Sequence, residues 1–354
     1  MNYVFANKPE FVEPIRVLFL CGSSFKDIKE DKRIILKEYL EQDSANKVIL
    51  LEKYFEFGSR KRQDGFLSYY DAKLFNLYNI ENLAALSATN VIVLHESIST
   101  AGEIGVFASN PFLREKLITM IPERYSIEEE KLSNFLHLAF WNKKEAIIPH
   151  RVIRYYPIIK EVYISENRST YYTYFFDNKI PKFAGQLLTK MIGNKCISNV
   201  CLSYAKKDKY KKYPSYIKHD PKCTYVNLEY SVFKNYIISL LTISEFRRSL
   251  LDCKMVYEVR DLFIKTFLNI LKNTVVENTK QCSDKLIVLL NKQPNFKIED
   301  AISFMIYMLH SCGFINIKNK DNGMISVHHK KSTANLLEKY TYLVRKIKPM
   351  EWGD

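Results

Sequence analysis

The sequence predicts an α/β protein in which a parallel, doubly wound domain is followed by a mostly helical region that ends in a winged helix. Three observations support this fold class. Short apolar runs alternate with helical patterns in the first third, the chain becomes strongly basic after it, and helical patterns precede a hairpin signal near the end. With 354 residues, the chain is long enough for more than one core. We expect three regions: 1–156, 157–255 and 256–354.

Five apolar runs in the first region are expected to form parallel strands buried on both faces. They are Arg16–Cys21, Lys47–Leu51, Asn90–Leu94, Lys116–Ile121 and Arg151–Tyr156. Helical spacing is present at Lys32–Glu41, Ala72–Ala88 and from about Thr100 to Ser109. Parallel sheets bind ligands outside the carboxyl ends of their strands. The segments that follow the first and third strands are therefore expected to share one functional rim.

The last hundred residues predict a separate helical domain. Helices are expected at Val256–Leu271, Asp284–Asn291 and Ile298–Cys312, followed by strands at Phe314–Lys318 and Met324–His328. Asn322-Gly323 between these strands is a strong hairpin signal. Three helices and a hairpin are typical of a winged helix. A final helix, about Ser332–Ile347, is expected to pack on a partner.

The charge is divided unevenly along the chain. Residues 1–150 contain 19 Lys and Arg against 21 Asp and Glu, whereas residues 151–354 contain 34 against 18. This excess favours a nucleic-acid partner over a membrane surface, because no basic helix with a clear apolar stripe stands out. Tyrosines alternate with Lys206, Lys207, Lys211 and Lys212, a pattern that suits phosphate contact and base stacking. A solvated loop explains it equally well.

Several classes of protein are disfavoured by composition. No apolar stretch approaches the ~20 residues that span a bilayer, and the N-terminus lacks the apolar core of a signal peptide. The seven cysteines lack zinc-site spacing, so we expect no metal and read them as buried, reduced thiols. A cytoplasmic protein without membrane association is expected.

The segment from His95 to Gly105 is the strongest local signal for chemistry. A strand ends there, a turn of small residues follows, and a helix begins with backbone N–H groups that can bind an anion. Glu103 is expected in the first turn of that helix, where an acid can also serve only to stabilise the helix N-terminus. Its place at the ligand rim favours a reactive carboxylate. Gly105 is expected to let the helix approach the sheet.

Four segments of the chain together resemble a known family. They are Leu18–Gly22, Glu52 before Tyr54-Phe55, Ile80–Leu83, and Glu96-Ser97 through Glu103-Ile104-Gly105. Over about residues 14–122 they resemble the nucleoside 2-deoxyribosyltransferase-like effectors of retrons, which are bacterial antiphage toxins. The resemblance implies a flavodoxin-like, deoxyribosyltransferase-like domain. It also implies a reverse transcriptase carrying RNA-linked single-stranded DNA as the restraining partner, in a higher-order assembly.

The resemblance also implies a catalytic role for Glu103, as nucleophile or electrostatic stabiliser at an anomeric carbon. Such a carboxylate suits N-glycosidic cleavage, which passes through an oxocarbenium-like state. The implied substrate is NAD or a related nucleotide, without a cofactor. Other candidate substrate-binding residues are Gly22 and Ser23 for close backbone approach, Ser97 and Thr100 for ribose or phosphate oxygens, and Glu96 for sugar hydroxyls or as a helix cap.

The chain departs from the family pattern in two places. His95-Glu96-Ser97 stands in place of an Asp cluster, and Phe25 stands where small-molecule deoxyribosyltransferases carry Tyr. These departures favour hydrolysis over base exchange. Alternatives are a TIR-like or phosphoribohydrolase-like NAD cleaver, the latter disfavoured by the lack of paired glycines before the Thr. A nucleotide-sensing, winged-helix DNA-binding regulator without catalysis is also an alternative, and it would not need a carboxylate at position 103.

Overall fold

The computed structural model describes the chain in segments, and contacts divide it into two units. The described residues are 2–22, 31–51, 55–56, 67–68, 77–95, 97–122, 151–155, 158–164, 167–173, 175, 179–180, 182–193, 195–204, 212–291, 297–319, 324–329 and 333–347. Ile15–Leu50 and Ala84–Cys196 form what we call the sheet unit. Met1–Pro14, Leu51–Leu83 and Ile197–Asp354 form the helical unit. Because both units are discontinuous, the linear boundaries after 156 and 255 stay predictions.

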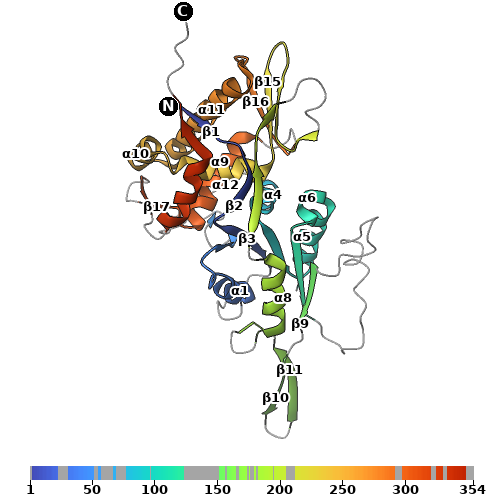
Figure 1. Ribbon diagram of the computed structural model, residues 1–354. Coiled ribbons are helices and arrows are strands. Elements are labelled where there is room, and N and C mark those ends of the chain that lie inside the picture. The colour runs from blue at the N-terminus through green and yellow to red at the C-terminus, as the bar shows by residue number, and fades with distance from the viewer. Residues whose placement is uncertain are drawn as a thin grey trace, which may run out of the picture. The chain divides into compact units, whose positions relative to one another are not determined.

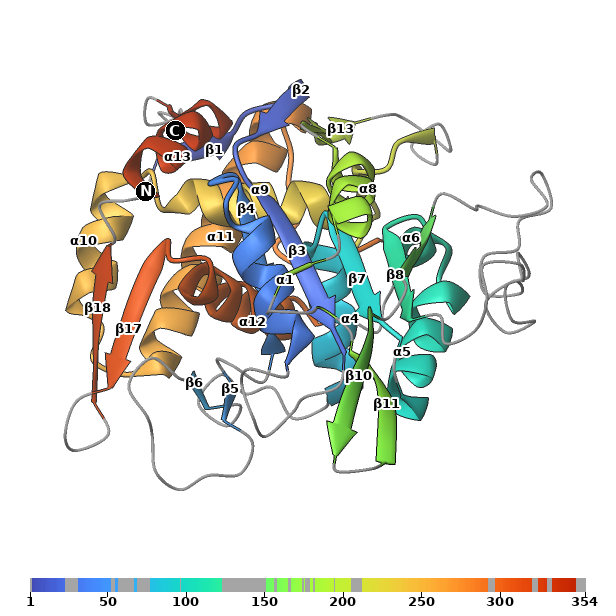
Figure 2. The same cartoon turned by 90° about the horizontal axis from the view of Figure 1, so that it is seen from below.

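A five-stranded parallel sheet is the centre of the sheet unit (Figure 2), as the sequence predicts. Its strand order is β4-β3-β7-β8-β9. The bounds are β3 (Arg16–Cys21), β4 (Asn46–Ile49), β7 (Asn90–Leu94), β8 (Leu117–Pro122) and β9 (Val152–Tyr155). All five strands lie close to their expected positions. Continuous apolar sequence therefore identified the strands correctly, because both faces of this sheet are covered.

Helices pack on both faces of this sheet (Figure 1). Alternate strand residues, among them Leu18 and Ile92, form one buried cluster with α1 (Lys32–Leu40) and α8 (Lys182–Ile192). On the opposite face, the ring of Phe19 meets that of Phe107 edge-on, with centroids 6.1 Å apart. Phe107 belongs to α5 (Ile98–Ser109). The two-residue period of a strand thus sends neighbouring side chains into different cores.

The strand order brings the ends of β3 and β7 together. The chain passes from β3 outward to β4 and then returns to the other side of β3, where it forms β7. Cys21 at the end of β3 pairs in parallel register with Val93, one residue before the end of β7. Open parallel sheets bind ligands where the strand order reverses in this way. The expected functional rim is therefore a consequence of the observed topology.

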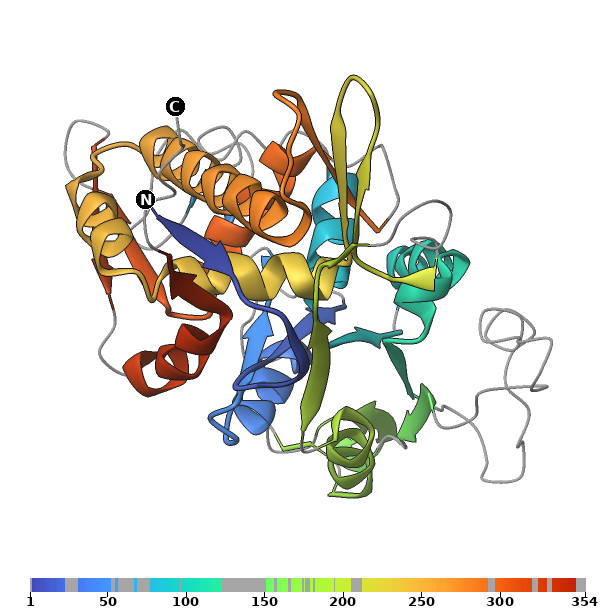
Figure 3. The same ribbon diagram turned by 45° about the horizontal axis from the view of Figure 1, so that its top comes forward.

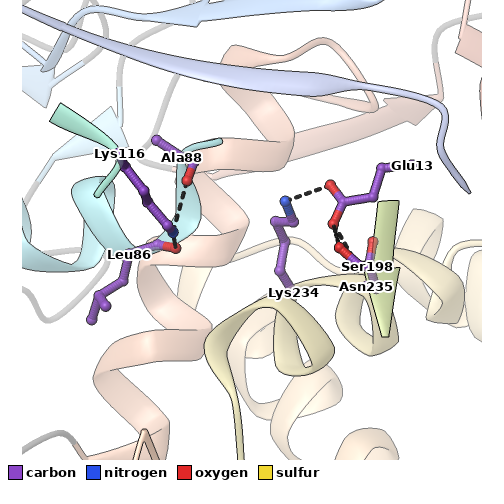
Figure 4. A network of polar contacts seen from close by, with 7 residues as sticks. All are labelled: Glu13, Leu86, Ala88, Lys116, Ser198, Lys234 and Asn235. Carbon is purple, nitrogen blue, oxygen red and sulfur yellow. Dashed lines mark hydrogen bonds and ion pairs between the residues drawn. The ribbon is translucent and has the colours of Figure 1, made fainter. Parts of the chain in front are cut away.

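A lysine side chain caps the end of the helix that precedes β7 in the sheet unit. The Nζ atom of Lys116 donates to the carbonyl oxygens of Leu86 and Ala88, at 2.9 Å each (Figure 4). These carbonyls lie at the end of α4 (Leu77–Ser87), where helix carbonyls lack partners within the helix. Further elements are α6 (Pro111–Arg114) and the antiparallel pair β10 (Ile158–Ile164) and β11 (Asn167–Thr173).

The helical unit is built around α9 (Tyr230–Leu240), α10 (Ser244–Asp252), α11 (Val256–Thr279) and α12 (Ile298–Ser311). The N-terminal strand β1 (Tyr3–Phe5) contacts α11 and pairs antiparallel with β19 (Val344–Lys346) near the end of the chain (Figure 3). Phe5 stacks on Tyr236 with ring centroids 4.1 Å apart. Residues 3–5 therefore pair with residues 344–346, more than 300 positions away in the sequence. The short strands β5 (Phe55–Glu56) and β6 (Leu67–Ser68) pair in parallel.

A buried ion pair connects three elements of the helical unit. Glu13 ends β2 (Lys8–Glu13), which pairs with β12 (Cys196–Val200). Its carboxylate accepts from Lys234 Nζ at 2.7 Å, from Asn235 Nδ2 at 3.0 Å and from Ser198 Oγ (Figure 4). Burial by itself raises the pKa of Glu13, but the charge of Lys234 and these hydrogen bonds outweigh it and hold the pKa below its usual value.

Two predicted helices of the C-terminal region are wrong. Asp284–Asn291 contains the strand β16 (Leu286–Leu290), parallel to β15 (Thr224–Leu228) in a sheet of order β13-β14-β15-β16. Its five consecutive apolar residues have no helical period, and a short apolar run is ambiguous until a partner strand is known. Ser332–Ile347 is broken into α13 (Ala334–Glu338), a 3-10 turn η6 (Lys339–Leu343) and β19. The other strands are β13 (Ser203–Tyr204) and β14 (Tyr216–His219).

The helix and hairpin signals before the C-terminus are confirmed. The helix α12 spans Ile298–Ser311, and β17 (Ile315–Asn319) pairs antiparallel with β18 (Ile325–His329). The backbone N–H of Ile325 donates to the Lys254 carbonyl at 2.7 Å, which ties the hairpin to the connection between α10 and α11. Across the ranges that the structure describes, no helix combines the length and the apolar character needed to cross a membrane.

Candidate functional site

Gly22 directly follows the last residue of β3. Its φ angle is +159°, and a Cβ atom there would lie 3.1 Å from Cδ of Arg33 and 3.2 Å from Cβ of Leu94. An L side chain at this position would therefore be strained by the backbone conformation and tightly packed against both neighbours, whatever binds nearby. Close approach of a nucleotide to the Gly22 backbone stays a prediction. Ser23 lies outside the described residues.

Asp31 and Arg33, which were not among the predicted site residues, form a buried pair beside Gly22. Asp31 caps α1 by accepting from the backbone N–H of Arg33 at 3.0 Å. Its two carboxylate oxygens also accept from Nε and an Nη atom of Arg33, at 3.0 and 2.9 Å. Both residues are buried, and the stem of Arg33 packs beside Gly22. An Asp that precedes a helix by one residue is a capping signal, but nothing in the sequence indicates its pairing with Arg33.

Ser97 and Thr100 organise the N-terminus of α5. Ser97 is the N-cap: its Oγ accepts from the Thr100 backbone N–H at 3.3 Å, and Thr100 Oγ1 accepts from the Ser97 backbone N–H at 3.0 Å. This reciprocal pair satisfies two donors at the start of the helix. Both residues lie at the expected rim, and their predicted contact with ribose or phosphate stays a prediction. Ile98, the first helical residue, is 93% exposed beside them.

Glu103 lies one turn deeper than expected. Because α5 begins at Ile98, Glu103 is its sixth residue, and the prediction that it occupies the first turn is wrong. The attraction between an acid and a helix N-terminus falls off beyond the first turn, so helix stabilisation is a weaker explanation for this residue. The side chain is half-buried and its Oε2 atom is buried. Residues three apart share one helix side, which puts Glu103 beside Thr100.

The two glycines that flank Glu103 do not serve close packing. A Cβ atom added at Gly102 or Gly105 would meet no atom of the described residues within 4 Å. The expectation that Gly105 permits close approach of helix and sheet is therefore wrong. The packing of α5 relies instead on larger buried residues such as Ile104 and Phe107.

His95 is a rim residue to which the sequence analysis assigned no role. Its backbone N–H donates to the Met120 carbonyl at 2.9 Å, so it directly continues β7. Its Nδ1 atom lies 3.3 Å from Thr100 Oγ1. Burial lowers the pKa of the imidazole, which favours its neutral form. The sequence did contain a signal for this residue. A histidine that directly follows a buried strand of a parallel sheet lies at the edge where such sheets bind ligands.

The structure brings four of the candidate residues to the sheet rim: Gly22, Ser97, Thr100 and Glu103. Glu96 lies outside the described residues, as do Lys206, Lys207 and Lys211 of the expected nucleic-acid contact. Lys212, also expected to contact nucleic acid, is described and exposed, and it belongs to the helical unit.

Two hollows that are lined by described residues lie elsewhere in the sheet unit. One of about 470 Å³ is lined by residues of α1 and α8 that include Tyr39 and Gln186. A second, of about 230 Å³, includes Arg16 and Asn46, which begin β3 and β4 and therefore mark the amino ends of the strands. These ends are opposite to the rim that carries Glu103. Among the described residues, no cluster of three or more His, Cys, Asp or Glu is placed to hold a metal ion.

Comparison with known proteins identifies a family for this chain. A family model described as STM3845 retron effector protein matches residues 29–348. A comparison with curated proteins finds no match. The family match includes the α5 rim, the parallel sheet after β3, and the helices and hairpin of the C-terminal region. Since it spans most of the chain, the protein belongs to the family of STM3845 retron effector proteins.

Proposed function

We propose that the protein is an antiphage toxin that hydrolyses the N-glycosidic bond of NAD or a related nucleotide, with Glu103 as its reactive carboxylate. The observation that carries this proposal is the position of Glu103, half-buried in the second turn of a helix that begins at the carboxyl ends of parallel strands. Membership of a retron effector family supports the antiphage role. The glycosidase activity is proposed from the residues at the rim, not from the family match.

The sheet unit suits this activity as a doubly wound, deoxyribosyltransferase-like domain. Its strand order reverses between β3 and β7, and helices pack on both faces. Gly22 and the N-terminus of α5 lie at that reversal, where such domains bind nucleotides.

The proposed reaction breaks the bond between the anomeric carbon and the nitrogen of the leaving base. The bonding electron pair moves to that nitrogen, and positive charge develops on the sugar. The Glu103 carboxylate stabilises or traps this charge, and water supplies the oxygen that replaces the base. With NAD, the pyridinium nitrogen already carries a positive charge, so nicotinamide leaves as a neutral molecule. The products are nicotinamide, ADP-ribose and one proton.

Expression of Glu103→Gln in cells tests the catalytic assignment. The change removes the negative charge but keeps the shape of the side chain, and we expect toxicity and nucleotide loss to disappear while the protein accumulates at its normal level. The matched control is Glu38→Gln, which removes an exposed carboxylate from α1. It should remain toxic. Undiminished toxicity of Glu103→Gln would contradict the assignment.

We propose further that a reverse transcriptase with its RNA-linked single-stranded DNA restrains the toxin through the basic C-terminal half. Of the elements expected to form a winged helix in this half, α11, α12 and the β17–β18 hairpin are present, whereas the expected middle helix is the strand β16. However, ten consecutive residues of α12, Ala301–His310, are buried. A winged helix that reads DNA inserts the helix before its hairpin into a groove, and α12 has no exposed face in this stretch. This disfavours the alternative of a DNA-reading regulator.

Co-expression with the partner tests the restraint. The protein alone should stop growth, and the protein with its ribonucleoprotein partner should be tolerated. Nuclease treatment of the purified complex should then restore NAD cleavage. Equal activity before and after nuclease treatment would show that the nucleic acid does not hold the enzyme inactive.

A further inference from the structure

The hydrogen bonds around Thr100 favour a proton on one particular nitrogen of His95. The Thr100 hydroxyl has one hydrogen, and Oγ1 donates it to the Ser97 carbonyl oxygen at 2.7 Å. The lone pairs of Oγ1 remain to accept hydrogen bonds, and the backbone N–H of Ser97 uses one of them at 3.0 Å. His95 Nδ1 lies 3.3 Å from the same oxygen. Because Thr100 Oγ1 already donates its only hydrogen to Ser97, it can form a hydrogen bond with Nδ1 only as an acceptor. Nδ1 must then carry the proton.

The other nitrogen of His95 follows from this assignment. A neutral imidazole carries one proton, so with Nδ1 protonated the Nε2 atom has a free lone pair. Partial burial favours the neutral ring over the imidazolium. His95 is thereby prepared as a proton acceptor before any substrate binds.

The location of His95 suits a proton acceptor for the proposed reaction. The residue continues β7 at the rim and contacts Thr100 in the first turn of α5, and Glu103 lies three residues after Thr100 on the same helix. We infer that His95 is the general base of the proposed hydrolysis and takes a proton from the attacking water through Nε2, while Thr100 holds the ring in the required tautomer. This inference rests on the proposed function of the rim.

The proton balance agrees with a cationic leaving group. Water oxygen bonds to the anomeric carbon, the carbon–nitrogen bond breaks, and its electron pair neutralises the pyridinium nitrogen. The proton lost by water moves to Nε2 and then to solvent. A neutral nucleobase would instead need a proton at its leaving nitrogen, which an unprotonated Nε2 does not supply. The tautomer thus favours pyridinium nucleotides over ordinary nucleosides.

A pair of variants tests the role of His95. In His95→Asn the side-chain amide can still donate to Thr100, as Nδ1 does, but it has no atom in the place of Nε2. We expect kcat/KM for NAD cleavage to fall about 10²- to 10⁴-fold, the range of general base catalysis. The wild type should lose activity in acid, at a pH below the ordinary histidine pKa of about 6.5, because burial lowers the pKa of His95. The variant should not show this loss. Added imidazole should partly rescue His95→Ala.

Nitrogen NMR of the imidazole in the full chain, made by cell-free synthesis with labelled histidine, tests the tautomer without reference to activity. We expect a protonated Nδ1 and an unprotonated Nε2 for His95, and the reverse tautomer would overturn the inference. A His95→Asn variant with unchanged kcat/KM and pH profile would also overturn it. If the folded wild type cleaves no NAD, the proposed function fails. If Glu103→Gln is inactive but His95→Asn is not, only the inference about His95 fails.

Discussion

The Glu13 cluster of the helical unit and the Glu103 rim of the sheet unit each contain a carboxylate, but in very different settings. Both oxygens of Glu13 accept hydrogen bonds from buried partners, and a lysine neutralises its charge at 2.7 Å. Glu103 is half-buried on a helix whose N-terminus borders the ligand rim. The hydrogen bonds of Glu13 join β2, β12 and α9, so its carboxylate has a structural role. For Glu103 we propose a different use, the stabilisation of positive charge on a substrate, and this contrast separates a structural acid from a candidate catalyst.

Breaking the Glu13 cluster should produce the largest loss of stability. Lys234→Met leaves the Glu13 carboxylate buried without its counter-charge, and removal of one partner of a buried ion pair typically costs about 3–5 kcal/mol. We expect a clearly lower urea midpoint for this variant. A double variant, Glu13→Leu with Lys234→Met, is the control, because removing both charges should recover part of the loss. Equal midpoints for wild type and Lys234→Met would show that the pair is not structural.

The pH dependence of stability should report the same cluster. The pKa of Glu13 is lower in the folded protein than its usual value, so its ionised form adds stability at pH values above the ordinary glutamate pKa of about 4.3. That contribution is lost as pH falls through the folded-state pKa. The difference in unfolding free energy between wild type and Glu13→Gln should therefore shrink in acid. A difference that grows below pH ~4 would contradict the direction of the shift.

Two glycines at the rim should respond oppositely to alanine. Gly22→Ala introduces a Cβ atom within 3.1–3.2 Å of Arg33 and Leu94 at a positive φ, and such overpacking typically costs about 1–3 kcal/mol. The added Cβ of Gly105→Ala meets no atom within 4 Å in the described part of the chain, and this variant should gain about 0.5–1 kcal/mol, because alanine favours the helix interior. Thermal unfolding measures both. If Gly105→Ala destabilises the protein as much as Gly22→Ala, the packing account of the rim is wrong.

The smallest expected effect on the enzyme concerns the basic segment. Replacing Lys206, Lys207, Lys211 and Lys212 with Gln should weaken nucleic-acid association and flatten its dependence on salt, because fewer counterions are released on binding. NAD cleavage by the freed enzyme should be unchanged, since the candidate site belongs to the sheet unit. Binding measured over a salt series checks this. An unchanged salt slope would identify the segment as a solvated surface.

Sequence reasoning predicted the sheet unit better than the C-terminal region. Fully buried parallel strands are continuous apolar runs, so Asn90–Leu94 was visible without knowledge of its neighbours. In contrast, Leu286–Leu290 becomes a strand because Thr224–Leu228, far away in sequence, pairs with it. Local pattern cannot reveal such a partner. The hydrogen-bonded cluster around Glu13 was not predicted for the same reason, since Lys234 lies 221 residues away in the sequence.

At the rim, the sequence predicted the elements that carry the described candidate residues, but it did not predict the contacts that these residues make. The start of α5 was expected two residues late, because the capping role of Ser97 was not recognised. That shift moved Glu103 out of the first turn. His95 was visible in the sequence, but its contact with Thr100 depends on how the strand delivers it to the helix N-terminus.

Cleavage of NAD by the purified full chain, freed from nucleic acid, tests the central claim most directly. Nicotinamide and ADP-ribose are quantified by mass spectrometry for the wild type, Glu103→Gln and the exposed control Glu38→Gln. We expect equimolar products from the wild type and from Glu38→Gln, and a loss of about 10²-fold or more in Glu103→Gln, because removed charge stabilisation is worth several kcal/mol in a dehydrated site. Cleavage by a folded Glu103→Gln variant at the wild-type rate would contradict the account.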